Sequence, residues 1–210
     1  MIAIIDYGMG NLRSAQKALE KVGCKAVITE NPKDLKNADA GILPGVGAFR
    51  DCYEGLKQKG FIEPIKEFVQ AGKPLLGICI GLQLLFEYGE EGSGSEGLGI
   101  FKGRVIRFPS TEQTGLKVPH MGWNFVQPVP DKTNPLLPSG KGGFAYFVHS
   151  YYPQPVDKSI VLATCDYGVS FPCIVGNGSV FGVQFHPEKS QQFGLQILQN
   201  FGEFIKRKKR

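Results

Sequence analysis

Short apolar runs alternate with amphipathic segments along the first half of the chain. Continuous apolar runs predict buried strands at 2–5, 26–28, 40–43 and 74–78. Apolar residues spaced three and four positions apart predict helices at 11–22, 49–59, 63–71 and 81–88, and Asn31-Pro32 adds a helix-start signal. This order predicts a parallel sheet with helices on both faces, because parallel strands need crossover connections.

The second half of the chain favours strands over helices. After a loop rich in Gly, Ser and Glu at 89–99, β-rich stretches occur at 104–108, 124–128, 144–152, 159–165, 173–176 and 179–184. Asn177-Gly178 predicts a hairpin turn between the last two stretches, and a final amphipathic helix is predicted over 193–206. No repeat or linker divides the chain. We therefore predict a single α/β domain over 1–210: an open, mostly parallel sheet covered by helices, plus an antiparallel β-rich C-terminal half.

Composition narrows the class of protein. The chain is 42% hydrophobic and 20% charged, as in ordinary globular proteins. No apolar run approaches the roughly 20 residues of a membrane helix. The start, Met1 through Asp6, is too short and too uncharged for a signal peptide. We expect a cytoplasmic protein with no membrane partner.

Cysteine and histidine usage bears on metal sites and disulfides. The five cysteines are scattered and odd in number, at positions 24, 52, 79, 165 and 173, which argues against a disulfide framework. With only three histidines and no closely spaced cysteine pair, no zinc site is expected.

The net charge of +5 comes from the C-terminal end of the chain. Lys206 to Arg210 are all basic; without these five, 19 basic residues remain against 19 acidic ones. A basic tail can bind nucleic acid or phosphate. Cations also suit the C-terminal end of a helix. We adopt the second interpretation and expect no nucleic-acid partner.

Candidate chemistry begins with Gly77-Ile78-Cys79-Ile80-Gly81, which ends a predicted strand and opens a helix. This is the pattern of a nucleophile elbow with Cys in place of Ser. Such a turn holds the sulfur at the carboxyl end of the sheet, and the helix start favours the reactive thiolate. The N–H of Ile80 would point at a developing oxyanion. A structural cysteine between two packing glycines fits this motif alone equally well.

A base for Cys79 follows a later predicted strand. His186 lies in Gln184-Phe185-His186-Pro187-Glu188. Residues two apart on extended backbone point the same way, so Glu188 can reach the imidazole and fix its tautomer. The alternative interpretation is a surface histidine before a turn, and the presence of the cysteine elbow argues against it. His120 and His149, at the ends of β-like runs, are interpreted as structural or rim residues.

The glycine-rich segment Pro44-Gly45-Val46-Gly47 directly follows the third predicted strand. A turn of this kind can bring backbone N–H groups beside the neighbouring elbow. A plain strand-to-helix turn would explain the same residues in isolation.

Together these motifs resemble those of class I, triad-type glutamine amidotransferases. The matching segments are Pro44–Gly47, Gly77–Gly81 with Gln83, and 186–188. Their order and spacing cover most of the chain. The resemblance implies Cys79 as nucleophile, His186 as acid and base, and Glu188 as its orienter, with no metal or organic cofactor.

The resemblance also implies residues around the triad. The oxyanion site would be formed by Gly45, Val46, Gly47 and Ile80. The substrate L-glutamine would be bound by Gln83, by Glu91 at its amino group, and by the backbone of His149, Ser150 and Tyr151 at its α-carboxylate.

Four further blocks resemble one branch of this family, the glutaminase subunits of imidazole glycerol phosphate synthase in histidine biosynthesis. They are 6–14 (DYGMGNLRS), 44–49 (PGVGAF), 119–124 (PHMGWN) and 147–151 (FVHSY). The resemblance implies a heterodimer with a (β/α)8-barrel cyclase that receives ammonia. Asn11, Trp123, Asn124 and Tyr146 would then lie on or near the docking face.

Other functions remain compatible with part of the pattern. A glutaminase subunit of another synthase would share the triad, but the blocks at 6–14 and 120–124 argue against it. A stand-alone cysteine peptidase or γ-glutamyl hydrolase would act on its substrate without a partner. A non-catalytic binding module of the same fold would not need Cys79, His186 and Glu188 together.

Overall fold

A computed structural model describes residues 1–208 of the chain; Lys209 and Arg210, the end of the basic tail, lie outside the described residues. Within this range the strands are β1 Ile2–Ile5, β2 Ala26–Thr29, β3 Ala40–Gly45, β4 Leu75–Cys79, β5 Phe86–Gly89, β6 Ser95–Glu96, β7 Phe101–Arg107, β8 His120–Pro128, β9 Gly143–His149, β10 Tyr151–Pro155, β11 Val161–Asp166, β12 Ser170–Asn177 and β13 Val180–Val183. The α-helices are α1 Leu12–Lys21, α2 Phe49–Gln58, α3 Ile62–Gln70, α4 Ile80–Leu84, α5 Thr111–Thr114 and α6 Gln191–Lys208. Short 3-10 helices are η1 Pro32–Asn37, η2 Lys158–Ile160 and η3 Pro187–Lys189.

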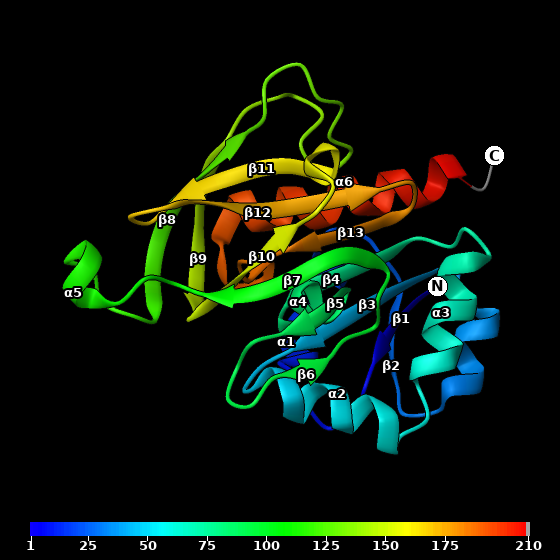
Figure 1. The fold of residues 1–210 in the computed structure, drawn as a ribbon. Coiled ribbons are helices and arrows are strands. Elements are labelled where there is room, and N and C mark those ends of the chain that lie inside the picture. The colour runs from blue at the N-terminus through cyan, green and yellow to red at the C-terminus, as the bar shows by residue number, and fades with distance from the viewer. Residues whose placement is uncertain (209–210) are drawn as a thin grey trace.

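Two sheets organise the described residues (Figure 1). The larger has nine strands in the order β2-β1-β3-β4-β13-β12-β11-β8-β9, and the smaller has four in the order β10-β7-β5-β6. Strands β2, β1, β3, β4 and β13 pair in parallel, whereas the rest of the large sheet is antiparallel. The predicted α/β fold class, with a parallel first half and an antiparallel second half, is confirmed.

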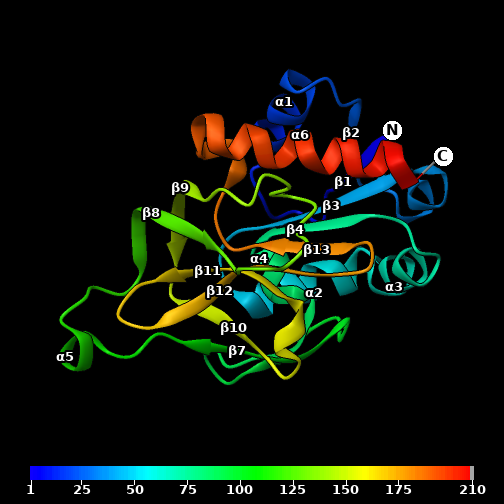
Figure 2. The same ribbon diagram turned by 90° about the horizontal axis from the view of Figure 1, so that it is seen from above.

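Helices cover both faces of the parallel strands (Figure 2). Helices α1 and α6 lie together on one face, and α2, α3 and α4 lie on the other. Strands β1, β3, β4 and β13 are buried along their whole length, as their continuous apolar sequences require. No helix within the described residues is long and apolar enough to cross a bilayer.

The segment after the elbow differs from its prediction. The predicted helix at 81–88 is wrong beyond Leu84: α4 stops there, and Phe86–Gly89 forms strand β5 of the small sheet. Leu82, Leu84, Leu85 and Phe86 are all buried, so the run has no polar face that would distinguish a helix from a strand.

The stretch predicted as one strand at 144–152 is two strands in two sheets. Strand β9 ends at His149 and pairs with β8, whereas β10 begins at Tyr151 and pairs with β7. Ser150 is the break between them, and it turns the chain at the carboxyl edge of the large sheet. A smaller correction concerns the hairpin: Asn177 pairs with Val180, so the turn consists of Gly178 and Ser179.

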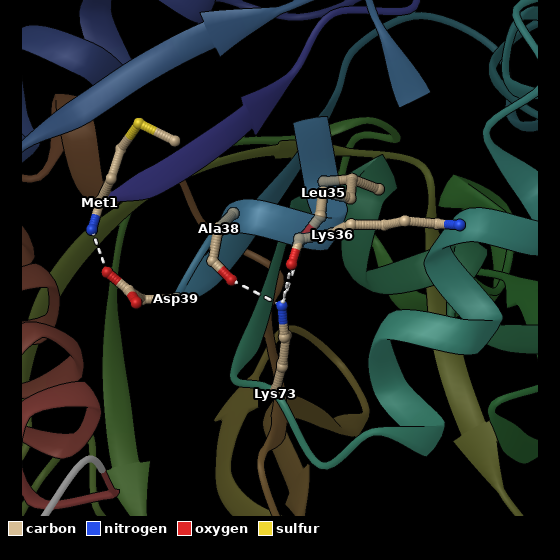
Figure 3. A network of polar contacts seen from close by, with 6 residues as sticks. All are labelled: Met1, Leu35, Lys36, Ala38, Asp39 and Lys73. Atoms are coloured by element: carbon tan, nitrogen blue, oxygen red, sulfur yellow. Dashed lines mark hydrogen bonds and ion pairs between the residues drawn. The ribbon is translucent and has the colours of Figure 1, made fainter. Parts of the chain in front are cut away.

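Polar contacts fix the opposite, amino-terminal ends of the parallel strands (Figure 3). Lys73, two residues before β4, donates from Nζ to the carbonyl oxygens of Lys36 at 2.7 Å and Ala38 at 2.9 Å. The amino group of Met1, before β1, pairs with the Asp39 carboxylate, before β3. These contacts tie three strands at one end and leave the other end to the predicted site. All five cysteines are free thiols.

Candidate active site

The three predicted motifs meet at the carboxyl ends of three neighbouring parallel strands. Strand β4 lies between β3 and β13, with Gly45 opposite Cys79 and Val183 opposite Ile78. This order explains how residues far apart in sequence share one site. Open α/β sheets bind ligands at this edge.

Cys79 occupies a strained turn between β4 and α4. Its φ of 57° and ψ of −112° are unusual for a residue with a side chain, as expected for a nucleophile elbow. The flanking glycines are required by close backbone approach. A Cβ at Gly81 would lie 1.8 Å from the Leu43 carbonyl oxygen, and one at Gly77 would lie 2.5 Å from the Gly81 carbonyl oxygen.

His186 and Glu188 form a buried pair beside the elbow. Nδ1 of His186 lies 2.8 Å from Oε1 of Glu188, and both side chains are only 3% exposed. Because the carboxylate accepts, Nδ1 donates and Nε2 is left for Cys79 or substrate. The contact between His186 and Glu188 was predicted, but the backbone conformation was not. Glu188 lies in the 3-10 helix η3, and not on extended chain, where it contacts the imidazole ring.

The electrostatics of His186 favour a protonated ring. Burial alone would lower its pKa, but Cys79 and Glu188 both stabilise the imidazolium, and the pKa is raised. Nε2 of His186 is buried with no hydrogen-bond partner, and so is Oε2 of Glu188. Sγ of Cys79 lies 3.9 Å from the carbonyl oxygen of Val148. The unpartnered Nε2 is the atom that a proton transfer would use.

A cavity of about 290 Å³ opens beside Cys79 and His186. Most of the residues predicted around the triad line it: Val46, Gly47, Ile80, Gln83, Glu91, His149, Ser150 and Tyr151. Gly45 does not line it, and Glu188 lies behind His186. The structure thus brings the predicted oxyanion residues other than Gly45, and the predicted substrate residues, to one cavity.

The predicted oxyanion segment is anchored by two buried side chains that the sequence analysis did not single out. The Tyr7 hydroxyl donates to the Pro44 carbonyl oxygen at 2.7 Å, and the Cys52 thiol donates to the Val46 carbonyl oxygen at 3.3 Å. Gly47 has a φ of +92° with open space around its Cα. Gly45 is instead crowded, since a Cβ there would lie 2.8 Å from the Gly81 nitrogen.

Gln83 and Glu91 line the cavity and also serve the fold. Gln83 Nε2 donates to the Tyr151 carbonyl oxygen at 2.9 Å and to Gln184 Oε1 at 3.2 Å, whereas its Oε1 is buried without a partner. One carboxylate oxygen of Glu91 accepts from the Phe49 N–H at 2.7 Å, at the start of α2. Glu91 therefore caps a helix while bordering the cavity.

The predicted docking residues fall into two places. Trp123 and Tyr146 are opposite one another on β8 and β9, with ring centroids 6.1 Å apart, and Asn124 follows Trp123. Asn11 comes from another element, the loop before α1. There it borders a small cavity, about 10 Å³, shared with Gly45, His186 and Glu188.

Ser190 is a further residue that sequence reasoning missed. Its hydroxyl donates to the His186 carbonyl oxygen at 2.6 Å and accepts from the Tyr146 N–H at 2.9 Å, joining the loop of His186 to β9. No local signal marks Ser190 or Gln184, because each bonds to a residue far away in sequence, Tyr146 and Gln83 respectively. Cys52 bonds to Val46, only six residues before it, but a single thiol in a helix forms no recognisable motif. Tyr7 at least lies within the block at 6–14.

Comparison with known proteins places the chain in a family. The chain belongs to the family described as glutamine amidotransferase class-I, whose model matches residues 3–204. The chain also belongs, within that family, with the imidazole glycerol phosphate synthase subunits HisH. It is 53% identical to the HisH subunit of Bacillus licheniformis, covering 100% of this chain and 99% of the relative. It is 54% identical to that of Syntrophotalea carbinolica, covering 97% and 100%.

Solved structures share the fold at lower identity. A crystal structure of a glutamine amidotransferase has a TM-score of 0.73 at 20% identity, covering 96% of this chain and 100% of its own. The structure of PurLQS from Thermotoga maritima has a TM-score of 0.74 at 20% identity, covering 97% of each chain. These likenesses confirm the fold.

Proposed function

We propose that this chain is the glutaminase subunit of an imidazole glycerol phosphate synthase and hydrolyses L-glutamine through Cys79, His186 and Glu188. One observation carries the proposal. A buried His186–Glu188 pair, 2.8 Å apart, stands beside a strained Cys79 at the mouth of a cavity lined by the predicted substrate residues. Full-length identity to HisH subunits supports the choice of synthase.

The first half of the reaction is amide cleavage. The Cys79 thiolate attacks the carboxamide carbon of glutamine, and its electrons move to the carbonyl oxygen, where the Ile80 N–H and a donor from the Gly45–Gly47 segment stabilise the negative charge. His186, kept protonated by Glu188, then gives a proton to the leaving nitrogen. Collapse of the tetrahedral intermediate breaks the C–N bond and yields ammonia and a glutamyl thioester.

The second half releases glutamate. His186, now neutral, removes a proton from water, and the hydroxide attacks the thioester carbonyl carbon. The C–S bond breaks, glutamate leaves, and the proton on His186 again faces the Cys79 thiolate. The Glu188 carboxylate holds the same imidazole tautomer throughout, because its Oε1 accepts from Nδ1. Neither half needs a metal or an organic cofactor.

The proposed partner is a (β/α)8-barrel cyclase in a heterodimer. Ammonia would pass to that subunit, which makes imidazole glycerol phosphate and an aminoimidazole carboxamide ribotide in histidine biosynthesis. Trp123 and Tyr146 support a docking face on β8 and β9, near Asn124, and Met121 adds a side chain that is 62% exposed. Five free cysteines suit the reducing cytoplasm.

The test separates the two halves of the synthase. Cys79→Ala should abolish synthase activity with glutamine while leaving activity with ammonium salts, measured in the complex with the cyclase. Cys173→Ala serves as a control, since that buried thiol lies on β12 and does not line the cavity. Continued use of glutamine by the Cys79→Ala complex would overturn the assignment.

A further inference from the structure

A chain of hydrogen bonds runs through the two histidines that the catalytic triad does not use. His149 Nδ1 lies 2.8 Å from the Tyr151 carbonyl oxygen, and His149 Nε2 lies 3.0 Å from His120 Nδ1. His120 Nε2 lies 3.2 Å from Asn124 Nδ2, which also donates to the Asp166 carbonyl oxygen at 2.8 Å. The chain connects three strands, β8, β9 and β11, with the start of β10.

The partners fix the direction of every bond. The Tyr151 carbonyl can only accept, so His149 carries its proton on Nδ1, and a neutral His149 accepts at Nε2. His120 must then donate from Nδ1 and accept at Nε2, where an Asn124 N–H donates. An additional proton on either ring would set two N–H groups against one another. The geometry therefore holds both imidazoles neutral, as Nδ1–H tautomers.

One end of this chain lies in the cavity beside Cys79. The Tyr151 carbonyl oxygen accepts from both His149 and Gln83, the latter at 2.9 Å. The bond from His149 to Tyr151 closes around Ser150, the break between β9 and β10. His149, Ser150 and Tyr151 all line the cavity. Loss of the His149 bond to Tyr151 would therefore remove a restraint on the backbone at Ser150.

The other end lies beneath an exposed apolar surface. Asn124 points inward on β8, whereas its neighbours Trp123 and Phe125 are 47% and 38% exposed. Phe125 packs edge-on against Phe144 of β9, which is 59% exposed. A partner that covers these rings would press on the strand that holds Asn124 and His120.

We propose that Asn124, His120 and His149 form a relay of positioning residues that sets the Ser150–Tyr151 backbone for the α-carboxylate of glutamine and couples it to contacts made on the outer face of β8. The proposal rests on the proposed function, which assigns the cavity to glutamine. None of the three side chains takes part in the chemistry. Their effect is on how well the carboxylate is held.

Packing alone does not account for the relay. Aromatic rings already surround the histidines: His120 stacks on Tyr167 with centroids 4.0 Å apart, and Phe108 lies 5.2 Å from His149. Apolar side chains would fill such a cluster without the cost of burying two imidazoles. What the imidazoles add is a directed set of hydrogen bonds from the strand edge to the cavity.

The first test reads the tautomers directly. Nitrogen NMR of the full chain labelled in its histidines, at neutral pH, should show His120 and His149 as neutral Nδ1–H rings, the less common tautomer of free imidazole. His120→Phe and His149→Asn assign the signals. An Nε2–H or doubly protonated His149 would overturn the relay. This measurement needs neither glutamine nor the cyclase.

The second test removes the donor of Asn124 without changing the size of the side chain; the bond to the Asp166 carbonyl is lost together with the one to His120. In Asn124→Asp a carboxylate replaces the donating amide, so His120 must carry its proton on Nε2. The unprotonated Nδ1 of His120 then faces the unprotonated Nε2 of His149, and the hydrogen bond between the two rings is lost. In the complex at saturating cyclase, KM for glutamine should rise roughly three- to tenfold, the effect of losing one hydrogen bond, with kcat retained. Gln127→Glu places the same charge on β8 away from the relay, and Phe108→Leu disturbs the packing alone; both should leave KM unchanged.

Each outcome decides the proposal. A rise in KM confined to Asn124→Asp supports the relay. An unchanged KM in that variant, or an equal rise in either control, overturns it. If the parent complex does not use glutamine, the proposed function fails and the carboxylate role falls with it, while the tautomers still show whether the hydrogen-bonded chain exists.

Discussion

The Tyr7 hydroxyl donates a 2.7 Å hydrogen bond to the carbonyl oxygen of Pro44. The Cys52 thiol donates in the same way to the carbonyl oxygen of Val46. The two bonds hold the Pro44–Gly45 and Val46–Gly47 peptides, which flank the Gly45–Val46 peptide. The middle peptide is thus fixed at both ends, and it belongs to the proposed oxyanion site.

Tyr7→Phe should loosen this anchor. The substitution removes one hydroxyl and leaves a buried carbonyl without its donor, which costs about 1–3 kcal/mol of unfolding free energy. We expect a lower kcat with little change in KM, since the oxyanion forms only after attack. Urea unfolding and steady-state kinetics of the complex measure the two effects. Tyr53→Phe is the control, because its hydroxyl makes only an exposed 3.4 Å contact with Glu96; equal losses in both variants would contradict the expectation.

The isolated chain should be a poor glutaminase that its liganded partner activates. Gly47, with a φ of +92° and open space at its Cβ position, lets the Val46–Gly47 peptide rotate once the Cys52 bond to the Val46 carbonyl is released, so that an N–H completes the oxyanion site only when the partner is engaged. One such donor is typically worth about 10²–10³ in turnover. Glutaminase activity of the chain, of the complex and of the complex with its nucleotide ligand measures the activation.

Gly47→Ala should reduce that activation while glutamine still binds. Gly45→Ala is less informative, because its Cβ would collide with the backbone at Gly81 and disturb the fold. Gly23→Ala, also at positive φ with open space, is the matched control for backbone strain. An isolated chain already running at the full rate of the liganded complex would rule out this form of control.

Glu188→Gln should leave the fold intact and slow the chemistry. The amide can still accept from His186 Nδ1, but it no longer stabilises the imidazolium, so the pKa of His186 falls. We expect kcat to drop by roughly 10²–10⁴, the range of general acid–base assistance. Thermal unfolding checks the fold, and a variant with parental kcat would remove Glu188 from the triad.

Stability should fall in mild acid because of the paired histidines. Burial lowers the pKa of His120 to about 4 and that of His149 to about 3, from an ordinary value of 6.5. Between these lowered pKa values and the ordinary value of 6.5, the unfolded chain binds more protons than the folded chain. The free energy of unfolding therefore decreases as the pH falls below about 6.5. Urea unfolding at pH 7 and pH 5 should show a smaller acid loss in His120→Phe than in the parent. Identical losses would mean that other groups carry the pH dependence.

Deleting Lys206 to Arg210 should change glutaminase kinetics little. Within the described residues, Lys206 pairs only with Glu203 of its own helix, 2.7 Å away, and both side chains are more than half exposed. An exposed pair of this kind contributes little to stability. A large fall in turnover at a constant folded fraction would show that the tail has a functional role.

Sequence reasoning was sufficient for the parallel strands and for bringing Cys79, His186 and Glu188 together. Each strand is a continuous apolar run, and Cys79 and His186 each follow one of them, so their meeting at a carboxyl edge could be predicted. The placement of β13 directly beside β4 could not, because strand order is a tertiary property. The break at Ser150 was missed for a related reason: β9 and β10 read as one β-rich stretch, and only their pairing with different sheets separates them.

Residues that support the site through a hydrogen bond to a neighbouring element were also beyond reach. Ser190 bonds across to β9, and Cys52 holds a carbonyl of the oxyanion segment, yet each is one ordinary polar or thiol residue in its local sequence. His120 and His149 were interpreted as structural or rim residues; the structure buries both, at 2% and 5% exposed, and joins them by a hydrogen bond that no local pattern encodes.

The five free thiols are not equivalent toward reagents. Burial raises the pKa of the Cys24, Cys52, Cys165 and Cys173 thiols, which keeps them in the unreactive protonated form. None of these four lines the cavity that holds Cys79. An alkylating electrophile shaped like glutamine should therefore react once per chain. The resulting mass increment counts competent molecules in a preparation and turns specific activity into a true rate per site.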